Sequence, residues 1–282
     1  MATTTLPGIA ATAISISVRE QHLQQLLQRR PPLPFIEILA DNYLSLRGPH
    51  YHALCQLAEH YPIVLHCVGL SIGSGGAAVS YLAKIKTMAD EIDAIAISDH
   101  LSASELNGVN SHDLLPISYQ QQFVEPLCAS IGRVQDYFKR PFILENVSRY
   151  LSYPDDQLNE GVLLTQLVQK TGIGLLFDIN NLFVTAHNLN LNSDQMLANL
   201  PLSAVSYYHL GGHQQQGQLL LDNHGSKIAE PVWQLYQQVL TLIGPKPTII
   251  EWDNNIPPLE ALFDEANKAH QLMYTAATRA AL

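Results

Sequence analysis

The feature that most constrains the fold is an eightfold alternation of short apolar runs and longer amphipathic stretches. The apolar runs are rich in strand-forming residues and nearly continuous, which is typical of parallel strands that helices cover. They span 11–17, 35–40, 63–67, 94–100, 142–147, 174–179, 204–210 and 248–252. Stretches with helical spacing follow at 19–30, 50–60, 78–92, 120–138, 161–170, 193–200, 229–243 and 258–282. This order predicts an α/β fold, a (β/α)8 TIM barrel with residues 1–282 as a single domain; an open doubly wound sheet is the alternative.

Composition narrows the class of protein. The net charge of −10 argues against a protein that grips a nucleic-acid backbone. The sequence has no apolar run of the roughly 18 residues that a membrane span needs, and its first residues lack the basic start of a signal peptide. The three cysteines, Cys55, Cys67 and Cys128, form no CxxC pair. We therefore expect a cytoplasmic protein with neither a nucleic acid nor a membrane as partner.

Acidic and imidazole side chains gather where the predicted strands end. In a TIM barrel the carboxyl ends of the strands meet at one mouth, and active sites form there. The residues are His66, Asp99, His100, Glu145, Asp178, His209, Asp222, His224, Glu251 and Asp253. Individually, several have simpler interpretations: Asp99 and Asp253 as helix caps, and Asn146, Asn180 and Asn181 as turn residues. Together, they would repel or lose hydration at high cost unless cations lay among them, which predicts a multinuclear metal centre.

The donor types indicate which metals fit. All are nitrogen or oxygen, because strand alternation should point Cys67 away from the side of His66. Such donors suit Fe, Mn or Zn. Eight ligands are too many for one ion and too few to saturate three, so we expect two or three ions with open positions, and Glu145 as a bridge. Asp222 and His224 are placed to hold the outermost ion.

Eight short segments resemble, in order, the multinuclear non-haem iron-dependent oxidative enzymes, which share the xylose-isomerase-like barrel. The resemblance covers about residues 35–258, and the segments are LHCVGLSIGS, SDHLS, HDLLPISY, LENVSRY, FDINNLFV, HLGGH, DNHG and IEWDNNIP. It implies two or three irons of mixed Fe(II)/Fe(III) state, with O2 as co-substrate. The implied ligands are His66, His100, Glu145, Asp178, His209, Asp222, His224 and Glu251.

The same resemblance implies a reaction and a partner. The substrate would be a ribosomally made precursor peptide, modified at a cysteine whose thiolate binds iron while a hydrogen is taken from its β-carbon. We expect a separate small recognition protein, since 282 residues leave little room beyond the barrel. The predicted catalytic residues are Glu145, His213 and Asp253. The predicted residues that orient ligands or face substrate are Asn42, Asn146 and Asn181.

Some positions depart from the pattern, and some segments stay open. Asn181 stands where the related endonuclease pattern has a histidine, and Asp41 stands where family members commonly have a glutamate. These departures indicate a divergent member with its own substrate. We expect 112–118 to cap a helix and the glycine-rich 69–76 to form a turn. The alternative functions are a Zn- or Mn-dependent hydrolase or isomerase on the same barrel, and a binding module without catalysis.

Overall fold

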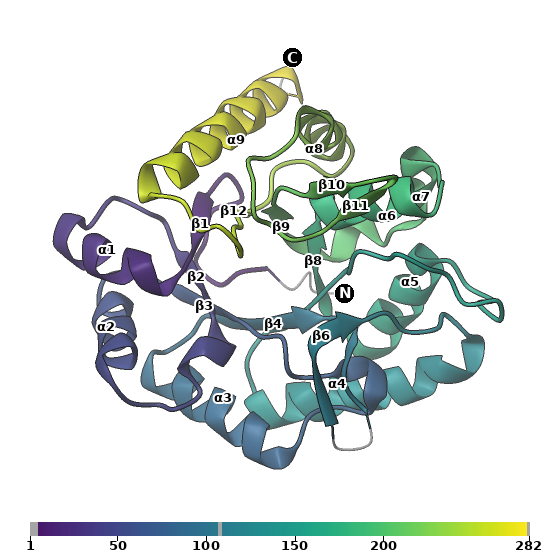
Figure 1. The fold of residues 1–282 in the computed structure, drawn as a ribbon, viewed down its shortest axis with the longest axis horizontal. Coiled ribbons are helices and arrows are strands. Elements are labelled where there is room, and N and C mark those ends of the chain that lie inside the picture. The colour runs from purple at the N-terminus through teal and green to yellow at the C-terminus, as the bar shows by residue number, and fades with distance from the viewer. Residues whose placement is uncertain (1–4, 107–108, 281–282) are drawn as a thin grey trace.

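Eight parallel strands close into a barrel in the computed structural model, which describes residues 5–106 and 109–280 (Figure 1). The strands are β1 (Ile14–Val18), β2 (Ile36–Leu39), β3 (Ile63–His66), β4 (Ala96–His100), β7 (Phe142–Glu145), β8 (Gly174–Asp178), β9 (Val205–Leu210) and β12 (Thr248–Ile250). Each pairs in parallel with its neighbours in the order β1-β12-β9-β8-β7-β4-β3-β2, and β2 returns to β1. The predicted TIM barrel is confirmed, and the open sheet is excluded.

Helices surround the strands, as Figure 1 shows. They are α1 (Leu23–Arg29), α2 (Pro49–Ala58), α3 (Val79–Glu91), α4 (Val124–Phe138), α5 (Glu160–Thr171), α6 (Ile179–Asn188), α7 (Ser193–Asn199), α8 (Glu230–Ile243) and α9 (Leu259–Ala280). Helix α6 is an addition to the predicted set. It starts directly at the end of β8, where Asp178 accepts a hydrogen bond from the Asn181 backbone at 2.6 Å and caps the helix. None of these helices, over the described residues, is long and apolar enough to cross a membrane.

Two antiparallel hairpins extend from the barrel. One joins β5 (Ala103–Leu106) to β6 (Val109–Leu115), and the other joins β10 (Gln214–Gln216) to β11 (Leu219–Leu221). The predicted helix cap at 112–118 is therefore wrong for its first half. Residues up to Leu115 form strand β6, and α4 begins only at Val124, after a short 3-10 turn (Gln121–Phe123). A strand within a loop is hard to predict because the hairpin is held by its partner strand and has little core of its own.

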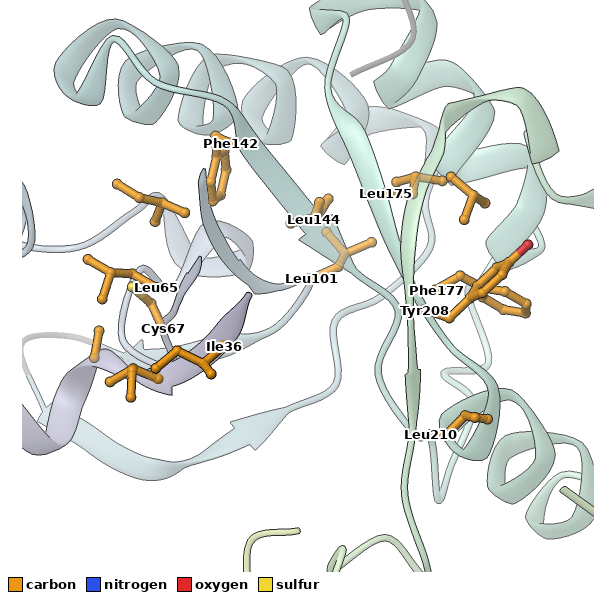
Figure 2. Close-up of a cluster of buried hydrophobic side chains, with 14 of the residues drawn as sticks. Ile36, Leu65, Cys67, Leu101, Phe142, Leu144, Leu175, Phe177, Tyr208 and Leu210 are labelled. Carbon is orange, nitrogen blue, oxygen red and sulfur yellow. The ribbon is translucent and has the colours of Figure 1, made fainter. Parts of the chain in front are cut away.

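The outer faces of the strands pack against the helices (Figure 2). Leu65, Phe142, Leu144 and Tyr208 are all buried in this layer. Cys67 lies in the same cluster and is fully buried, so it faces away from the barrel interior as its position in the sequence predicts. Truncating one such leucine to alanine removes apolar contacts and leaves a cavity, which typically costs about 2–5 kcal/mol.

The inner faces of the strands form an apolar floor. A second buried cluster consists of Leu6, Ala13, Phe35, Val64, Ala96, Ile143, Leu176, Tyr207 and Ile249. Side chains alternate along a strand, so a residue two positions later points into the barrel one step nearer the carboxyl end. Those next positions are occupied by polar residues: Glu37, His66, Ser98, Glu145, Asp178, His209 and Glu251. The strand pattern that builds the floor thus places five of the eight predicted ligands directly above it: His66, Glu145, Asp178, His209 and Glu251.

Candidate metal centre

The predicted ligands converge at the carboxyl ends of the strands. Seven of the eight are buried, and Asp222 is partly buried. At one end of the set, Oε2 of Glu145 lies 3.4 Å from Nε2 of His66 and 3.2 Å from Nε2 of His100. The rings of His66 and His100 meet edge to face with centroids 4.7 Å apart. Strands β3, β4 and β7 are neighbours in the barrel, so residues remote in sequence arrive side by side.

A second group lies across the barrel from the first and shares Glu145 with it. Nδ1 of His209 is 2.8 Å from Oε2 of Glu251 and 3.6 Å from Oε1 of Glu145. Asp178 completes this group, whose ligand atoms all lie within 4.8 Å of one another. Four donors at this spacing can surround one ion. Glu145 presents one oxygen to each group, which is the arrangement expected of the predicted bridge.

A third group stands at the mouth and shares Glu251 with the second. Nδ1 of His224 lies 3.2 Å from Oε2 of Glu251 and 3.3 Å from Oδ2 of Asp253. Asp253 is the exposed member, with 36% of its side chain accessible. The three groups therefore form a continuous row, linked by two shared carboxylates, from the buried wall of the barrel to its opening.

Several buried polar atoms in the cluster lack hydrogen-bond partners within the described part of the chain. Buried polar atoms in folded proteins are nearly always hydrogen-bonded. Yet Oε2 of Glu145, Oδ2 of Asp178, Nε2 of His224 and both ring nitrogens of His209 are buried with no hydrogen-bond partner among the described residues. Nε2 of His209 lies beside Oε1 of Glu37, which is likewise without a hydrogen-bond partner, and the other atoms face neighbouring predicted ligands. The residues fit metal ions, because each orphaned atom is a nitrogen or oxygen donor that a cation would satisfy.

Burial and neighbouring charges shift the pKa values of several residues in the cluster. Burial raises the pKa of Glu145, and burial with the nearby charges of Glu145 and Asp222 raises the pKa of Asp178 well above its ordinary value. Burial lowers the pKa of His100, but the charges of Glu145 and Asp99 outweigh it and raise this pKa to about 9. At Glu251, by contrast, burial is outweighed by the charges of His209 and His224, which lower its pKa well below the ordinary value. Metal ions bound among these groups would balance their negative charge. These buried His, Glu and Asp clusters suggest a multinuclear metal site.

Asp222 is held differently from the other predicted ligands. Its Oδ1 lies 2.8 Å from Nε2 of His224, while Ser148 and Asn180 each donate a hydrogen bond to it at 2.9 Å. His224 meets the third group through its other nitrogen. The predicted pairing of Asp222 with His224 around an outer ion thus corresponds to a direct contact between the two side chains.

The predicted supporting residues are placed unequally. Asn146 donates to the carbonyl of Asp178 at 3.0 Å and accepts from its amide at 2.9 Å, which fixes the end of β8. Asn181 donates to Oε1 of Glu145 at 3.5 Å. Asn42 lines the cavity described below. His213 stacks on Phe183 and contacts Asn180 at 2.7 Å, so it reaches Asp222 only through Asn180.

Two charged residues of the site are absent from the predicted set. Arg19, directly after β1, forms a short ion pair with Asp253 and lies 3.6 Å from Glu251. Glu37, in β2, is 1% exposed and lies 2.8 Å from Nε2 of His209. Both left a signal in the sequence. A charged residue inside the apolar run 35–40, and an arginine at the end of another run, are costly to bury without partners.

The glycines after β9 allow close approach to the centre. A methyl group on Gly211 would overlap the imidazole of His224, and one on Gly212 would overlap the carbonyl of Ser226. Only glycine leaves room for the chain to pass beside these groups. The glycine-rich segment 69–76 forms a turn, as predicted, with a 3-10 helix (Ile72–Ser74) and positive φ angles at Gly75 and Gly76.

A cavity of about 440 Å³ opens above the centre. Its walls include the ligands His66, His100, His224 and Glu251. Asp113 and Leu114 bring the β5–β6 hairpin to its rim, and with Val68 they also line a neighbouring hollow of about 500 Å³. Other residues of the cavity wall offer polar and apolar side chains to a bound molecule: Leu39, Asn42, Val147, Ser148, Tyr150, Asn223 and Asn254.

The fold is similar to that of solved TIM barrels with low sequence identity to this chain. A xylose isomerase domain protein from Planctomyces limnophilus aligns with a TM-score of 0.58 at 13% identity, covering 95% of this chain and 98% of that chain. The 3-keto-D-glucoside 4-epimerase from E. coli aligns with a TM-score of 0.57 at 12% identity, covering 92% and 99%. At such low identity the likeness concerns the fold alone.

Sequence comparison then assigns the family. Residues 13–274 match the family model described as RiPP precursor modification enzyme MbnB/TglH/ChrH, so the chain belongs to this family of enzymes that modify ribosomally made precursor peptides. A protein of Chromobacterium violaceum described as a UPF0276 protein is 38% identical over 274 residues, covering 97% of this chain and 98% of that protein. Another UPF0276 protein, from Acaryochloris marina, is 38% identical over 265 residues, covering 93% and 96%. The family predicted from the eight segments is confirmed.

Proposed function

We propose that this chain is a multinuclear iron-dependent enzyme that uses O2 to modify a ribosomally made precursor peptide at a cysteine. The observation that carries the proposal is the row of three ligand groups joined by Glu145 and Glu251, in a member of a peptide-modifying family. A binding module without catalysis would have no need of several buried, mutually repelling ligand groups beneath an open cavity.

The proposed ligands divide among the groups. His66, His100 and Glu145 would hold one iron, and Glu145, Asp178, His209 and Glu251 a second. The outer group, which we propose holds a third iron where it is occupied, comprises His224, Glu251 and Asp253, with Asp222 against His224. Ferrous ions in such a site supply one-electron chemistry with O2 and lower the pKa of a bound thiol.

The protein side chains around the cavity would bind and orient the peptide. Asp253, at the mouth, is placed to accept the proton of an incoming thiol, and Arg19 holds its carboxylate in position. Asn42 and Ser148 offer polar atoms to a peptide backbone, while burial of the inner ligands excludes water from the reacting centre. His213 acts, in this proposal, on Asp222 through Asn180.

The shape of the cavity favours a chain over a compact molecule. The cavity and the neighbouring hollow share Val68, Asp113 and Leu114, so they lie next to each other at the β5–β6 hairpin, and we propose that together they form one path for the peptide. An extended peptide advances about 3.3–3.6 Å per residue, so such a path accommodates several residues on one side of the modified cysteine. We further propose that a separate recognition protein delivers the peptide, and that both act in the cytoplasm.

The test is anaerobic loading of the purified protein with Fe(II), followed by addition of O2 and a cysteine-containing precursor peptide. We expect O2 consumption and a change in peptide mass that both require the cysteine. The same peptide with serine in place of cysteine is the matched control. Absence of O2 consumption with every cysteine-bearing precursor encoded near the gene would refute the proposal.

The same donor set also suits Zn and Mn, so the experiment carries a second arm. Protein loaded with either metal is offered sugars and abasic duplex DNA without O2. Turnover there, with none in the iron arm, would replace the oxidative function by that of a hydrolase or isomerase.

A further inference from the structure

A buried relay of three hydrogen bonds and one ion-pair contact connects two of the proposed metal ligands. It consists of His66, Ser98, Tyr207, Glu37 and His209, which lie on four different strands and are each at most 2% exposed. Nδ1 of His66 lies 2.9 Å from the Ser98 hydroxyl, which lies 2.9 Å from the Tyr207 hydroxyl. The Tyr207 hydroxyl lies 3.0 Å from Oε2 of Glu37, whose Oε1 lies 2.8 Å from Nε2 of His209.

The direction of every hydrogen bond follows from the carboxylate of Glu37. The Tyr207 hydroxyl donates its single proton to Oε2 of Glu37. Tyr207 therefore has to accept from Ser98, and Ser98, having used its own proton, has to accept from His66. At the other oxygen, Oε1 of Glu37 and Nε2 of His209 form an ion-pair contact of 2.8 Å, and neither atom has a hydrogen-bond partner among the described residues. A proton of His209 on Nε2 satisfies this contact, and with Glu37 accepting at both oxygens each contact then holds one proton.

This assignment leaves one ring nitrogen of each histidine free for metal. His66 keeps its proton on Nδ1 and presents Nε2, which is the atom 3.4 Å from Glu145. His209 keeps its proton on Nε2 and presents Nδ1, the atom beside Glu251 and Glu145. The free nitrogens are thus the ones that face the ligand groups. A histidine ligand needs its second nitrogen held in this way, since that contact sets both tautomer and ring orientation.

We propose that Glu37 is a positioning residue of the metal centre: it fixes His209 directly and His66 through Tyr207 and Ser98. The inference rests on the proposed metal site and extends it to a residue outside the ligand set. Glu37 sets two ligands that bind through different nitrogens, and it does so from one buried carboxylate. The serine and tyrosine make the relay long enough to span the barrel interior.

Glu37→Gln tests the proposal because glutamine keeps the shape and cannot satisfy both ends. If the amide nitrogen faces His209, that ring has to accept on Nε2, which moves its proton to Nδ1 and blocks the metal-facing atom. If the amide nitrogen faces Tyr207 instead, every hydrogen bond of the relay reverses, and the proton of His66 moves to Nε2. Either orientation places one of the two histidines in the wrong tautomer.

The measurements are the affinity and stoichiometry of Fe(II) and Zn(II), each added alone to metal-free protein. We expect Glu37→Gln to weaken binding by about 10–100-fold, the usual effect of losing such a partner. In the zinc-loaded protein, ¹⁵N shifts of the imidazoles should show His66 bound through Nε2 and His209 through Nδ1. Tyr207→Phe cuts the relay while leaving the contact of Glu37 with His209, so it should disturb His66 alone.

Glu160→Gln is the matched control. Glu160 is also a buried glutamate, with 9% exposure. Like Glu37 it accepts a hydrogen bond from a tyrosine, here Tyr119 at 3.2 Å. It lies outside the ligand groups. The variant should bind metal like the unaltered protein. Equal metal affinity in Glu37→Gln and Glu160→Gln, with both variants folded by circular dichroism, would overturn the inference. If the unaltered protein itself binds no metal, the proposed function fails instead.

Discussion

Glu145 offers the sharpest test of how the ligand groups are linked. Its two oxygens face different groups, Oε2 toward His66 and His100, and Oε1 toward His209. Glu145→Gln keeps the size of the side chain but removes its charge, so it should weaken two metal sites at once. His100 belongs to the first group alone, so His100→Gln should weaken only one.

The magnitude follows from binding linkage. A metal present at 100 times its Kd stabilises the folded state by about 2.7 kcal/mol per site. A 100-fold loss of affinity leaves about 0.4 kcal/mol of this, so each weakened site costs about 2.3 kcal/mol. Glu145→Gln should therefore lose about 4.6 kcal/mol of metal-dependent stabilisation, and His100→Gln about half as much. At about 2–4 °C per kcal/mol, the two losses in Tm are about 9–18 °C and 5–9 °C.

The assay is thermal unfolding with and without metal, joined to metal analysis of the same samples. The metal-free Tm of each variant serves as its own baseline, which separates lost binding from lost folding. At this metal concentration each weakened site is about half occupied, so we expect the metal content to fall by about half an equivalent in His100→Gln and by about one in Glu145→Gln. Equal losses in the two variants would refute the reasoning that Glu145 is shared.

Three further predictions concern other parts of the chain. Gly211→Ala should displace the ring of His224 and lower metal content without abolishing folding, as metal analysis and circular dichroism would show. Chelator should remove metal first from the outer group, because Asp253 is exposed while the inner ligands are buried; a time course of metal release checks this. Burial, only partly offset by Arg149, raises the pKa of Glu160 from 4.5 to about 7, so the folded state holds this proton more tightly than the unfolded chain does. The unfolding free energy should therefore fall by about 3 kcal/mol between pH 4.5 and pH 7 from this group, and urea unfolding of Glu160→Gln should lack that part of the fall.

The barrel could be predicted because its signal repeats. Each strand is a short apolar run, and eight of them alternate with helical stretches, so an error in one run leaves the pattern intact. Elements that lie outside this repeat were not predicted from the sequence. Helix α6 begins at Ile179, directly after β8, and the residues Asn180 and Asn181 that suggested a turn lie in its first turn. The β5–β6 and β10–β11 hairpins are local structures outside the eightfold repeat of strand and helix.

Whether a site residue could be predicted from the sequence depended on its position in its strand. His66 and Glu145 end their strands and His209 is the last residue but one of β9, so each stands at the barrel mouth, where a polar residue is conspicuous. Glu37 lies inside its strand, where an isolated charge has no obvious partner in the sequence. Its partners, Tyr207 and His209, are about 170 residues away and meet it only when the barrel closes. Contacts of that kind depend on register around the whole barrel, which a single sequence does not reveal.

The barrel interior has an apolar floor with polar side chains above it, and the two parts are physically related. Val64, Ile143 and Ile249 build an apolar floor, and His66, Glu145 and Glu251 stand two residues later on the same strands. Between and beside them, Glu37, Ser98 and Tyr207 supply the acceptors and donors that an apolar floor cannot offer to an imidazole. A histidine that binds metal through one nitrogen leaves an N–H to be satisfied at the other, and burial makes an unsatisfied N–H costly. The polar groups of Glu37, Ser98 and Tyr207 are therefore a consequence of burying histidine ligands above an apolar core.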